Sequence, residues 1–395
     1  MTSGLLLTGA RLVGTRTPDC GVGWLSTTGS TITGLGAGRP PAGEAAGRTT
    51  VDLGGRTLMP GFIDVHVHGA VGHEAMDASV PGLQAMASFF ASHGVTSFLP
   101  TTWTASRAGT LAALRAIAEA RTLEGAGARV LGAHMEGPYL SSARCGAQDP
   151  DEIRGVDRDE AAQFLDTGAV RLITVAPEAD GAGDLLDECV RRGVTVSVGH
   201  TDATYDQVAE AVRRGARHMT HTYNAMSALD HRRPGAVGAA LALPGFRAEV
   251  IADGVHVHPV AVQALLRARG VDEVVLVTDA LRPTGSTGGE LQLGGRTARV
   301  RDGAVRFADG QLVGSVLTMD VALRNVRELS GRSLEQLWPL VSRNPAAAAG
   351  VGDRKGALDV GMDADLVVLD EDVRVVLTIV EGQRVHDVTA QEEDR

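Results

Sequence analysis

The chain has 395 residues, 44% of them hydrophobic, and a formal net charge of -11. That length exceeds one average domain and suffices for a barrel with a small appended domain. The negative charge argues against nucleic acid or an anionic membrane surface as a partner, because both select a basic face. No apolar run approaches the length of a membrane span, and the start of the chain lacks the basic region of a signal peptide.

The cysteine pattern indicates a reducing compartment. Cys20, Cys145 and Cys189 are far apart and form no C-x-x-C pair, so neither a disulfide framework nor a zinc knuckle is implied. We therefore expect a cytoplasmic protein.

Both ends of the chain have residue patterns typical of β-strands. Residues 1–60 consist of short β-type segments interrupted by Gly and Thr, which predict a small antiparallel sheet. Residues 350–395 show the same strand-like pattern, in GALDVGMDADLVVLD and VRVVLTIVEGQRV. We expect the two ends to build one β-sandwich together, with the rest of the chain inserted between them.

Residues 61–349 alternate apolar strand-like runs with Ala-rich helical stretches, which is typical of parallel strands joined by crossover helices. Eight such runs predict an α/β fold, a (β/α)8 barrel of the TIM type. The runs are GFIDVHVH, GVTSFLPT, VLGAHME, RLITVAPE, VTVSVGH, ARHMTH, AEVIADG and EVVLVTD. A Gly-rich stretch at about 285–315 is expected to form a hairpin insertion over the barrel mouth, and an uninvolved surface hairpin is the equal alternative.

Five of these runs end in residues that can bind a metal ion or act as a base. The C-terminal ends of parallel strands converge at one mouth of a barrel, so residues far apart in sequence become neighbours there. Imidazoles with a carboxylate and an additional aspartate suit a hydrolytic zinc or iron site, which needs ligands for the ion and a base for its water. The candidates are His66, His68, Glu136, His200, His221 and Asp279.

His66 and His68 lie two positions apart on one strand, so both side chains point to the same face, expected to be the barrel interior near its mouth. A lone buried histidine is more often a core residue, but a pair on one face favours metal binding. Glu136 ends its strand, where a buried carboxylate without a cation would be unfavourable. If Glu136 binds a metal ion, as a bridging or a terminal ligand, the cation compensates the buried negative charge. His134 shares the face of Glu136 and is interpreted as a core residue or as support for a ligand.

His200 and His221 end two consecutive strands and should lie side by side at the mouth. With Glu136 they would complete a three-ligand site that leaves one position open for water. His218 lies three residues before His221, which predicts that it points to the other face and packs against helices. Asp279 closes the last strand, where we expect a general base, the alternative being an aspartate that caps the next turn.

Motifs along nearly the whole chain resemble one known family. HVHG, HMEGPYL, GHTDAT, THTYNAM, DGVHV and VTDA, followed by GSVLTMD, NPA and GMDADLVVLD, are similar to the N-acetylglucosamine-6-phosphate deacetylases of the amidohydrolase superfamily. The last motif marks only the superfamily, whereas EGP with THxYNAM and DGxHV is much narrower.

The resemblance implies a divalent metal held by Glu136, His200 and His221. It implies a second ion at His66 and His68, with Glu136 bridging the two. Some members of the family lack the H-x-H pair and use one ion, so one or two ions per subunit are expected. Zinc is the expected metal, with iron, cobalt and manganese as alternatives.

The resemblance also implies contacts with a phosphorylated amino sugar. Asp253 and His256 match the segment beside the phosphate, and Arg232 matches an arginine that reaches the phosphate from a neighbouring subunit, which implies a homodimer or a higher homo-oligomer. Arginine and histidine suit a phosphate because both form charge-assisted hydrogen bonds. The alternatives are a solvated Arg232 and an H-x-H pair at His256 that only imitates a metal motif. Further substrate contacts are implied for Ala147, Asn224, Ala225, Leu312, Val313 and Gly314.

Gln148 departs from the family pattern, since many relatives carry a histidine there that is thought to polarise the substrate carbonyl. A glutamine amide can donate a hydrogen bond to the substrate but cannot become cationic. Stabilisation of the oxyanion would then fall more on the metal. Cys145, on the same loop, is interpreted as an inert thiol, the alternative being a residue that flanks the pocket.

The residue patterns predict a metal-dependent hydrolase, and the family resemblance implies that it removes the acetyl group from N-acetyl-D-glucosamine 6-phosphate. The nearest alternative is the same reaction on another N-acyl amino sugar phosphate, such as the galactosamine epimer, because the sequence does not show which hydroxyls are read. A deaminase or cyclic amidase is the second, although many cyclic amidases carry a carboxylated lysine on strand four and RLITVAPE has none. A non-catalytic scaffold is the third, but a scaffold should have lost ligands. Neither nucleic acid nor membrane is expected as a partner.

Overall fold

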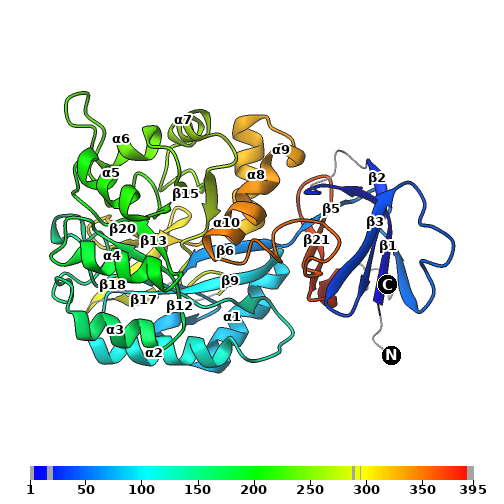
Figure 1. Ribbon diagram of the computed structural model, residues 1–395, viewed down its shortest axis with the longest axis horizontal. Coiled ribbons are helices and arrows are strands. Elements are labelled where there is room, and N and C mark those ends of the chain that lie inside the picture. Colours follow the sequence, from blue (N-terminus) through cyan, green and yellow to red (C-terminus); the bar gives the residue numbers. More distant parts are fainter. Residues whose placement is uncertain (1–3, 16–20, 287–289, 294, 389–395) are drawn as a thin grey trace.

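The computed structural model describes residues 4–15, 21–286, 290–293 and 295–388. Within these ranges the chain forms a barrel of alternating strands and helices with a smaller β domain beside it (Figure 1). None of the described helices combines the length and the apolar character that a bilayer span requires. Cys20 lies outside the described residues, and Cys145 and Cys189 are free thiols.

The barrel contains eight parallel strands, which confirms the fold expected from the sequence. Each strand is hydrogen-bonded to the next one in chain order. The first and last strands meet where Asp279 N donates to His66 O and His68 N donates to Ala280 O, both at 2.9 Å. The strands are β6 (Phe62–Val67), β9 (Val95–Thr102), β11 (Ala133–Glu136), β12 (Val170–Val175), β13 (Thr195–Val198), β14 (His218–Met219), β15 (Arg247–Ile251) and β16 (Val274–Val277), with the short β10 (Arg129–Val130) paired to β9.

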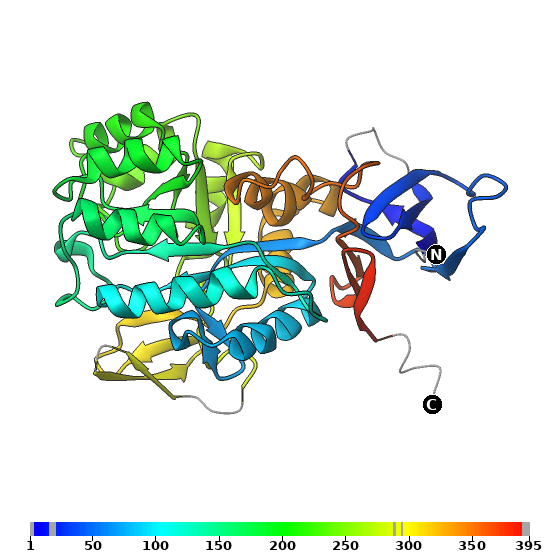
Figure 2. The same cartoon turned by 60° about the horizontal axis from the view of Figure 1, so that its bottom comes forward.

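One helix follows each barrel strand, and the helices cover the outside of the barrel (Figure 2). Local sequence defines their ends: in α5, Thr204 and Gln207 form a capping box, and Gly215 ends the helix with a φ of 114°. The helices are α1 (Val80–Ser92), α2 (Arg107–Ala120), α3 (Arg158–Asp166), α4 (Ala182–Arg191), α5 (Tyr205–Arg214), α6 (Gly235–Ala242), α7 (Pro259–Arg269) and α8 (Met319–Ser330).

Shorter elements complete the barrel. Three consecutive helical segments follow α8, namely α9 (Leu334–Trp338), η3 (Pro339–Arg343) and α10 (Asn344–Ala348). The loops after β6 and β11 carry β7 (Gly69–Ala70), β8 (His73–Glu74), η1 (Ala75–Asp77) and η2 (Ser142–Arg144).

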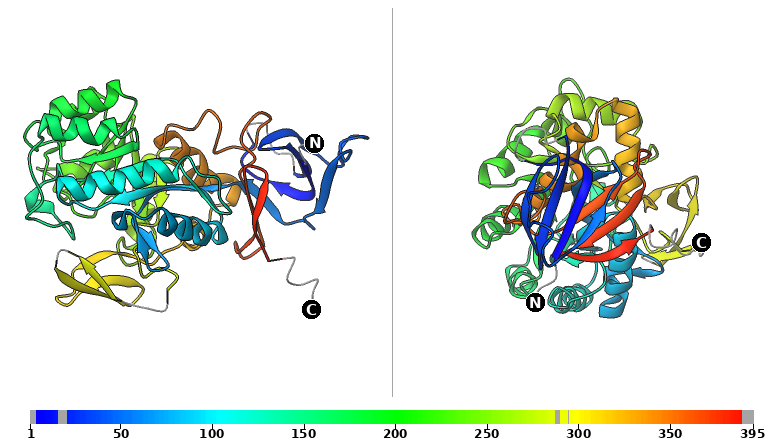
Figure 3. Two further views of the ribbon diagram at one scale, coloured as in Figure 1. Left: turned by 90° about the horizontal axis from the view of Figure 1, so that it is seen from below. Right: turned by 90° about the vertical axis from the view of Figure 1, so that its right-hand side faces the viewer.

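The small domain is one hydrogen-bonded sheet that contains strands from both ends of the chain (Figure 3). Its order is β23-β22-β21-β5-β1-β2-β3, and β4 pairs with β1. β5 ends at Pro60 and β6 begins at Phe62, so the chain passes directly from this sheet into the barrel. The strands are β1 (Gly4–Leu12), β2 (Val22–Thr28), β3 (Thr31–Ala37), β4 (Arg48–Asp52), β5 (Thr57–Pro60), β21 (Leu366–Leu369), β22 (Val375–Val380) and β23 (Gln383–Asp387).

The expectation of a purely antiparallel sheet in residues 1–60 was wrong. β4 and β5 both run parallel to β1, β4 beside its first half and β5 beside Arg11 and Leu12. The reason is the connection: the hairpin of β2 and β3 and the loop after it bring the chain back to the start of β1 before β4 begins. A parallel pair needs such a long crossover, whereas sequence neighbours joined by a tight turn pair antiparallel.

The Gly-rich stretch after β16 is larger than the expected hairpin. It forms a four-stranded antiparallel sheet with its own apolar core around Trp103, Leu281 and Phe307. This sheet returns to the barrel mouth, since Ser315 N donates to Asp279 O at 2.9 Å. Its strands are β17 (Glu290–Leu293), β18 (Arg296–Arg301), β19 (Ala304–Phe307) and β20 (Leu312–Ser315); residues 287–289 and 294 lie outside the described residues.

Candidate active site at the barrel mouth

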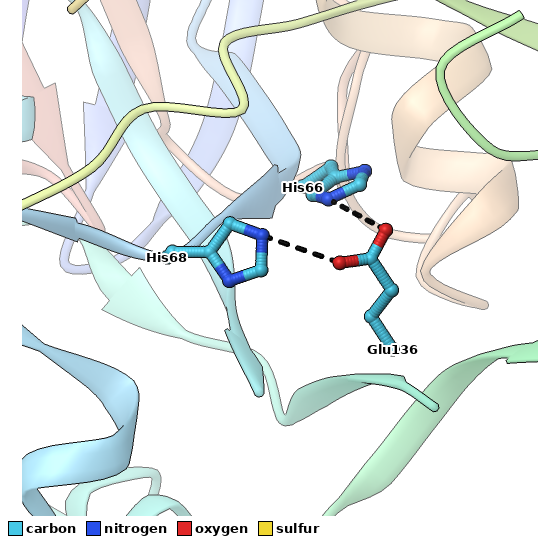
Figure 4. Close-up of side chains that lie close together, drawn as sticks. All are labelled: His66, His68 and Glu136. Carbon is cyan, nitrogen blue, oxygen red and sulfur yellow. Dashed lines mark ion pairs between the residues drawn. The ribbon is translucent and has the colours of Figure 1, made fainter. Parts of the chain in front are cut away.

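Glu136, at the end of β11, lies at the centre of a group of buried imidazoles. His66, in β6, and His68, just after it, face the Glu136 carboxylate: His66 Nε2 lies 3.5 Å from Oε1 and His68 Nε2 lies 3.3 Å from Oε2 (Figure 4). On the other side, His200 Nε2 and His221 Nε2 lie 3.2 and 3.1 Å from Oε1. The C-terminal ends of β6, β11, β13 and β14 thus bring the five predicted ligands together.

The arrangement fits a divalent cation. His66 Nε2 and Glu136 Oε1 are buried and form no hydrogen bond to any described residue, although nitrogen and oxygen atoms converge around them. Two sets of donor atoms lie within 4.8 Å of one another, His66 with His68 and Glu136, and Glu136 with His200 and His221. Because Glu136 belongs to both sets, the residues can hold one ion or two with a shared carboxylate.

A third set, His66 with His134 and Glu249, is also close enough to hold an ion. His134 is not available as a ligand there, because its Nδ1 lies 3.0 Å from Val65 O and its Nε2 lies 2.7 Å from Thr174 Oγ1. Burial lowers the pKa of His134 to about 3, so the ring is neutral. His134 is a core residue beneath the cluster.

Three side chains of the cluster follow their strands in the left-handed backbone region. His200 has a φ of 46°, His221 of 26° and Asp279 of 49°. Few residues other than glycine adopt these angles, and such strain collects at functional sites. The turn directs each side chain inward just after the strand ends. His200 is also oriented by a contact of 3.0 Å between its Nδ1 and Arg144 O, which leaves Nε2 for Glu136.

The prediction that His218 packs against helices was wrong. His218 is buried inside the barrel, where its Nε2 lies 2.8 Å from Glu249 Oε1. The prediction assumed that side chains alternate between the two faces of a regular strand from His218 to His221. β14 ends at Met219, however, and the positive φ of His221 breaks the alternation between the two histidines.

The carboxylates of the cluster are ionised. Burial alone would raise the pKa of Glu136, but the His66 and His200 imidazoles hold it well below its ordinary value. Burial opposes ionisation of Asp279 in the same way, and the charge of His66 and the hydrogen bond with His68 keep its pKa low. Conversely, burial would lower the pKa of His66, and Glu136 and Glu249 hold it well above the ordinary value. The cluster therefore attracts positive charge.

Asp279 lies at the edge of the cluster, where a base is needed. Its Oδ1 is 3.3 Å from His68 Nε2 and 3.6 Å from His66 Nε2. The ionised carboxylate lines the same cavity as Glu136, His200 and His221. It is therefore placed to accept a proton from a molecule bound between the ligands and the cavity.

A cavity of about 220 Å³ opens over the cluster, a volume suited to a small substrate. The insertion closes one side of it through Leu312 and Val313 of β20, and Gln311 Nε2 donates to Gly146 O at 2.6 Å across the opening. Of the residues predicted to contact substrate, the cavity is lined by Ala147, Gln148, Asn224, Ala225, His256, Leu312 and Val313.

Gln148 is held against the cluster. Its Nε2 donates to Glu136 Oε2 at 2.7 Å and its Oε1 accepts from Thr104 N at 2.7 Å. The side chain is buried, with 3% of its surface exposed. One of its two amide hydrogens is therefore committed to orienting Glu136.

Asp253 does not line the cavity, but it orients His256, which does. Its Oδ2 lies 2.6 Å from His256 Nδ1, and its Oδ1 accepts from Val255 N and His256 N, both at 2.8 Å. His256 Nε2 is buried and has no hydrogen-bond partner among the described residues. The ring therefore has one nitrogen free for a ligand.

Besides Asp253, two further predicted contact residues lie outside the cavity of this chain. Arg232 is exposed in the loop between β14 and α6, where its backbone N donates to Asp230 Oδ1 at 3.0 Å. Gly314 supports Asp279 from behind. A Cβ at Gly314 would lie 2.9 Å from Leu281 Cγ and 3.0 Å from Asp279 O, so a larger residue would displace the base.

Sequence reasoning missed three residues of the site. Trp103 stacks on His68 with ring centroids 3.9 Å apart. Asp64 lies beneath His66, and burial raises its pKa to about 7. Glu249 lies on β15, is fully buried and contacts His66 Nδ1 at 3.0 Å. The available signal for Asp64 and Glu249 was an acidic residue inside an apolar strand-like run, FIDV and AEVI.

Comparison with known proteins identifies the class first. Residues 57–385 match the model of the Amidohydrolase family. N-acetylglucosamine-6-phosphate deacetylase of Bacillus subtilis (strain 168) is 40% identical over 330 residues, which are 82% of this chain and 83% of that protein. N-acetylgalactosamine-6-phosphate deacetylase of Escherichia coli O157:H7 is 38% identical over 328 residues, 82% of this chain and 87% of that protein.

The solved structures agree with the sequence relatives. The crystal structure of N-acetylglucosamine-6-phosphate deacetylase from Pasteurella multocida has a TM-score of 0.90 at 30% identity, and the match covers 96% of this chain and 99% of that one. The chain therefore belongs to the amidohydrolase superfamily of metal-dependent hydrolases and, within it, to the N-acetylglucosamine-6-phosphate deacetylase family.

Proposed function

We propose that this protein hydrolyses N-acetyl-D-glucosamine 6-phosphate to D-glucosamine 6-phosphate and acetate in the cytoplasm, as a step of amino sugar catabolism or recycling. The observation that carries the proposal is the joint placement of Glu136, its two histidine pairs and Asp279 around one cavity. The names of the relatives favour this reaction over that of a cyclic amidase or a deaminase, and over a non-catalytic scaffold.

The metal centre proposed for this reaction has one or two divalent ions. Glu136, His200 and His221 would hold the principal ion, and His66 and His68 would hold the second with Glu136 shared. Zinc suits a set of imidazoles and a carboxylate, and iron, cobalt or manganese are alternatives. When bound, such an ion acts as a Lewis acid that polarises the amide carbonyl and makes water more acidic.

Asp279 is the proposed general base and acid. The ionised carboxylate accepts a proton from the attacking water, whose oxygen forms a bond to the acetyl carbon. As the C–N bond breaks, Asp279 returns that proton to the departing amine, because an unprotonated amide nitrogen is a poor leaving group. Water is thus divided between acetate and the amino sugar, and Asp279 is ionised again at the end.

His256 and Arg232 are proposed to bind the 6-phosphate, and Asn224 is proposed to contact the substrate. His256 offers a buried Nε2 at the cavity, and Asp253 holds the other ring nitrogen. Arg232 is exposed and does not line the cavity of its own chain, and we propose that it enters the site of a neighbouring subunit in a homodimer or a higher homo-oligomer. The remaining cavity residues would contact the sugar and the acetyl group: Ala147, Gln148, Ala225, Leu312 and Val313, with Gly314 behind them.

The proposal predicts a strong preference for the 6-phosphorylated sugar over plain N-acetylglucosamine. Each charge-assisted hydrogen bond to the phosphate is worth about 1.5 to 3 kcal/mol and is lost with the plain sugar. Acetate release is measured as kcat/KM on both sugars and on N-acetylgalactosamine 6-phosphate. The galactosamine epimer is the second candidate substrate, favoured by the relative from Escherichia coli O157:H7.

A matched pair of histidine variants tests the phosphate contact. His256→Ala should lower the ratio of kcat/KM on the phosphorylated sugar to kcat/KM on the plain sugar. His258→Ala, which removes an exposed ring two residues later, should leave this ratio unchanged. Equal efficiency on phosphorylated and plain sugar in the unaltered protein would remove His256 and Arg232 from the site. No acetate from any of the three sugars would refute the proposed function.

A mixed dimer tests whether Arg232 acts across the subunit boundary. Homodimers of Arg232→Ala and of Asp279→Asn should both be impaired, since each lacks one residue at every site. A heterodimer of the two variants contains one site with both residues intact, so activity should reappear when it is isolated through two different tags. Arg233→Ala, the exposed neighbour, serves as the control and should stay active. Absence of recovery in the heterodimer would assign Arg232 to its own chain or to no site.

A further inference from the structure

The carboxylate of Glu249 lies beneath the metal-binding cluster and accepts from three different groups. Its Oε2 lies 3.0 Å from His66 Nδ1 and accepts from His221 N at 3.0 Å. Its Oε1 lies 2.8 Å from His218 Nε2. The side chain is fully buried in β15 and reaches no solvent. A buried carboxylate in such surroundings persists only when its oxygens are satisfied in this way.

The contact with His66 determines which of its ring nitrogens faces the cluster. Glu249 Oε2 accepts from His221 N at 3.0 Å, so this oxygen acts as a hydrogen-bond acceptor, and Oε1 is occupied by the contact with His218 Nε2. Because this acceptor lies 3.0 Å from His66 Nδ1, Nδ1 is the nitrogen that keeps its proton when the ring becomes neutral to bind a metal. His66 Nε2 is then the nitrogen that faces Glu136 Oε1 and Asp279 Oδ1, at 3.5 and 3.6 Å.

The contact with His221 acts on the backbone. His221 has a φ of 26°, and its strained turn directs Nε2 to within 3.1 Å of Glu136 Oε1. Glu249 Oε2 binds the amide N of this same residue. One carboxylate oxygen therefore connects a candidate ligand on β6 with a candidate ligand after β14, one from each of the two possible ion positions.

We propose that Glu249 is the positioning residue of the metal centre, which fixes the tautomer of His66 and the backbone turn of His221 and thereby sets the affinity for the ions. Loss of a carboxylate that orients a metal-bound histidine typically weakens metal affinity by about 10- to 100-fold. The inference rests on the proposed function only in that the cluster must bind a metal. It assigns Glu249 no contact with substrate.

Metal binding by purified metal-free protein tests this role without any activity measurement. Glu249→Ala, Glu249→Gln and the unaltered chain are titrated with Zn²⁺ against a competing chelator, and folding is followed by circular dichroism. Glu249→Ala should weaken Zn²⁺ binding by about 10- to 100-fold. The matched control is Asp320→Ala, because Asp320 is also buried and lies 3.0 Å from a histidine nitrogen, His93 Nδ1, without binding a candidate ligand. It should bind Zn²⁺ like the unaltered chain.

Glu249→Gln should give an intermediate affinity. The amide oxygen can replace Oε2 and accept from His66 and His221, but the amide nitrogen then faces His218 Nε2. His218 would have to move its proton to Nδ1, a buried atom without a hydrogen-bond partner among the described residues. If Glu249→Ala does not fold, this variant decides the question, and an affinity equal to that of the unaltered chain overturns the proposal.

Failure of the proposed function and failure of the positioning role of Glu249 give different results. If the unaltered chain binds no divalent metal, the proposed function itself is wrong. If it binds Zn²⁺ and Glu249→Ala binds it equally well, only the positioning role is overturned, and Glu249 is then a buried partner that stabilises the barrel interior. A variant that loses thermal stability to the same extent as Asp320→Ala but keeps its metal affinity leads to the same conclusion.

Discussion

Removal of the divalent ion by a chelator is expected to abolish acetate release, and addition of zinc, iron, cobalt or manganese is expected to restore it. The reason is the composition of the mouth: four imidazoles converge on Glu136, and Glu136 Oε1 and His66 Nε2 make no hydrogen bond within the described residues. Without an ion these groups have nothing with which to polarise an amide. The measurement is acetate release together with metal content per chain. Full activity in exhaustively demetallated protein would contradict the entire assignment.

Ligand variants should separate the two ion positions. His200→Ala or His221→Ala should lose the principal ion and the activity, because each removes one of the two histidines that form that position together with Glu136. The double variant His66→Ala with His68→Ala should lose at most the second ion. His231→Ala, which removes an exposed histidine outside the cluster, should keep its full metal content. Loss of all metal in the β6 double variant would show that the positions are not independent.

Asp279→Asn is expected to lower kcat by roughly two to four orders of magnitude, the usual contribution of a general acid-base residue. Asparagine keeps the shape of the side chain but cannot accept and return a proton. The carboxylate is already ionised in the site, where His66 and His68 hold its pKa low, so the unaltered enzyme starts with the base ready.

The control for this variant is its metal content and its fold, both of which should be retained, because five other side chains form the two donor sets. A fall in metal content would attribute the loss of activity to the ion. Turnover close to that of the unaltered enzyme, with metal present, would place the base elsewhere in the cavity.

Much of the site could be predicted because its residues stand at strand ends. The apolar run of β6 ends in His66 and His68, and that of β11 ends in Glu136, so period-two alternation and barrel geometry were enough to group them. Asp279 could be grouped with them for the same reason, because it lies just after the end of β16. The structure brings these residues together as expected.

Predictions failed where a residue left the regular strand or where a partner came from another part of the chain. His218 was misplaced because the left-handed turn at His221 is not visible in the residue pattern. Glu249 was passed over because its partners lie on β6 and β14, and no local pattern joins them to β15. The parallel pairing of β4 and β5 with β1 likewise depends on how a long connection folds back.

The sequence by itself determined the alternation of strands and helices, and with it the barrel and the set of residues at its mouth, because side-chain periodicity and strand ends are local properties of the chain. Only the tertiary structure decided which atoms meet. It directs Gln148 to Glu136, His256 to Asp253, and leaves Arg232 outside its own cavity. Hydrogen bonds and burial join residues that are distant in sequence, and they arise only when strands and loops pack together.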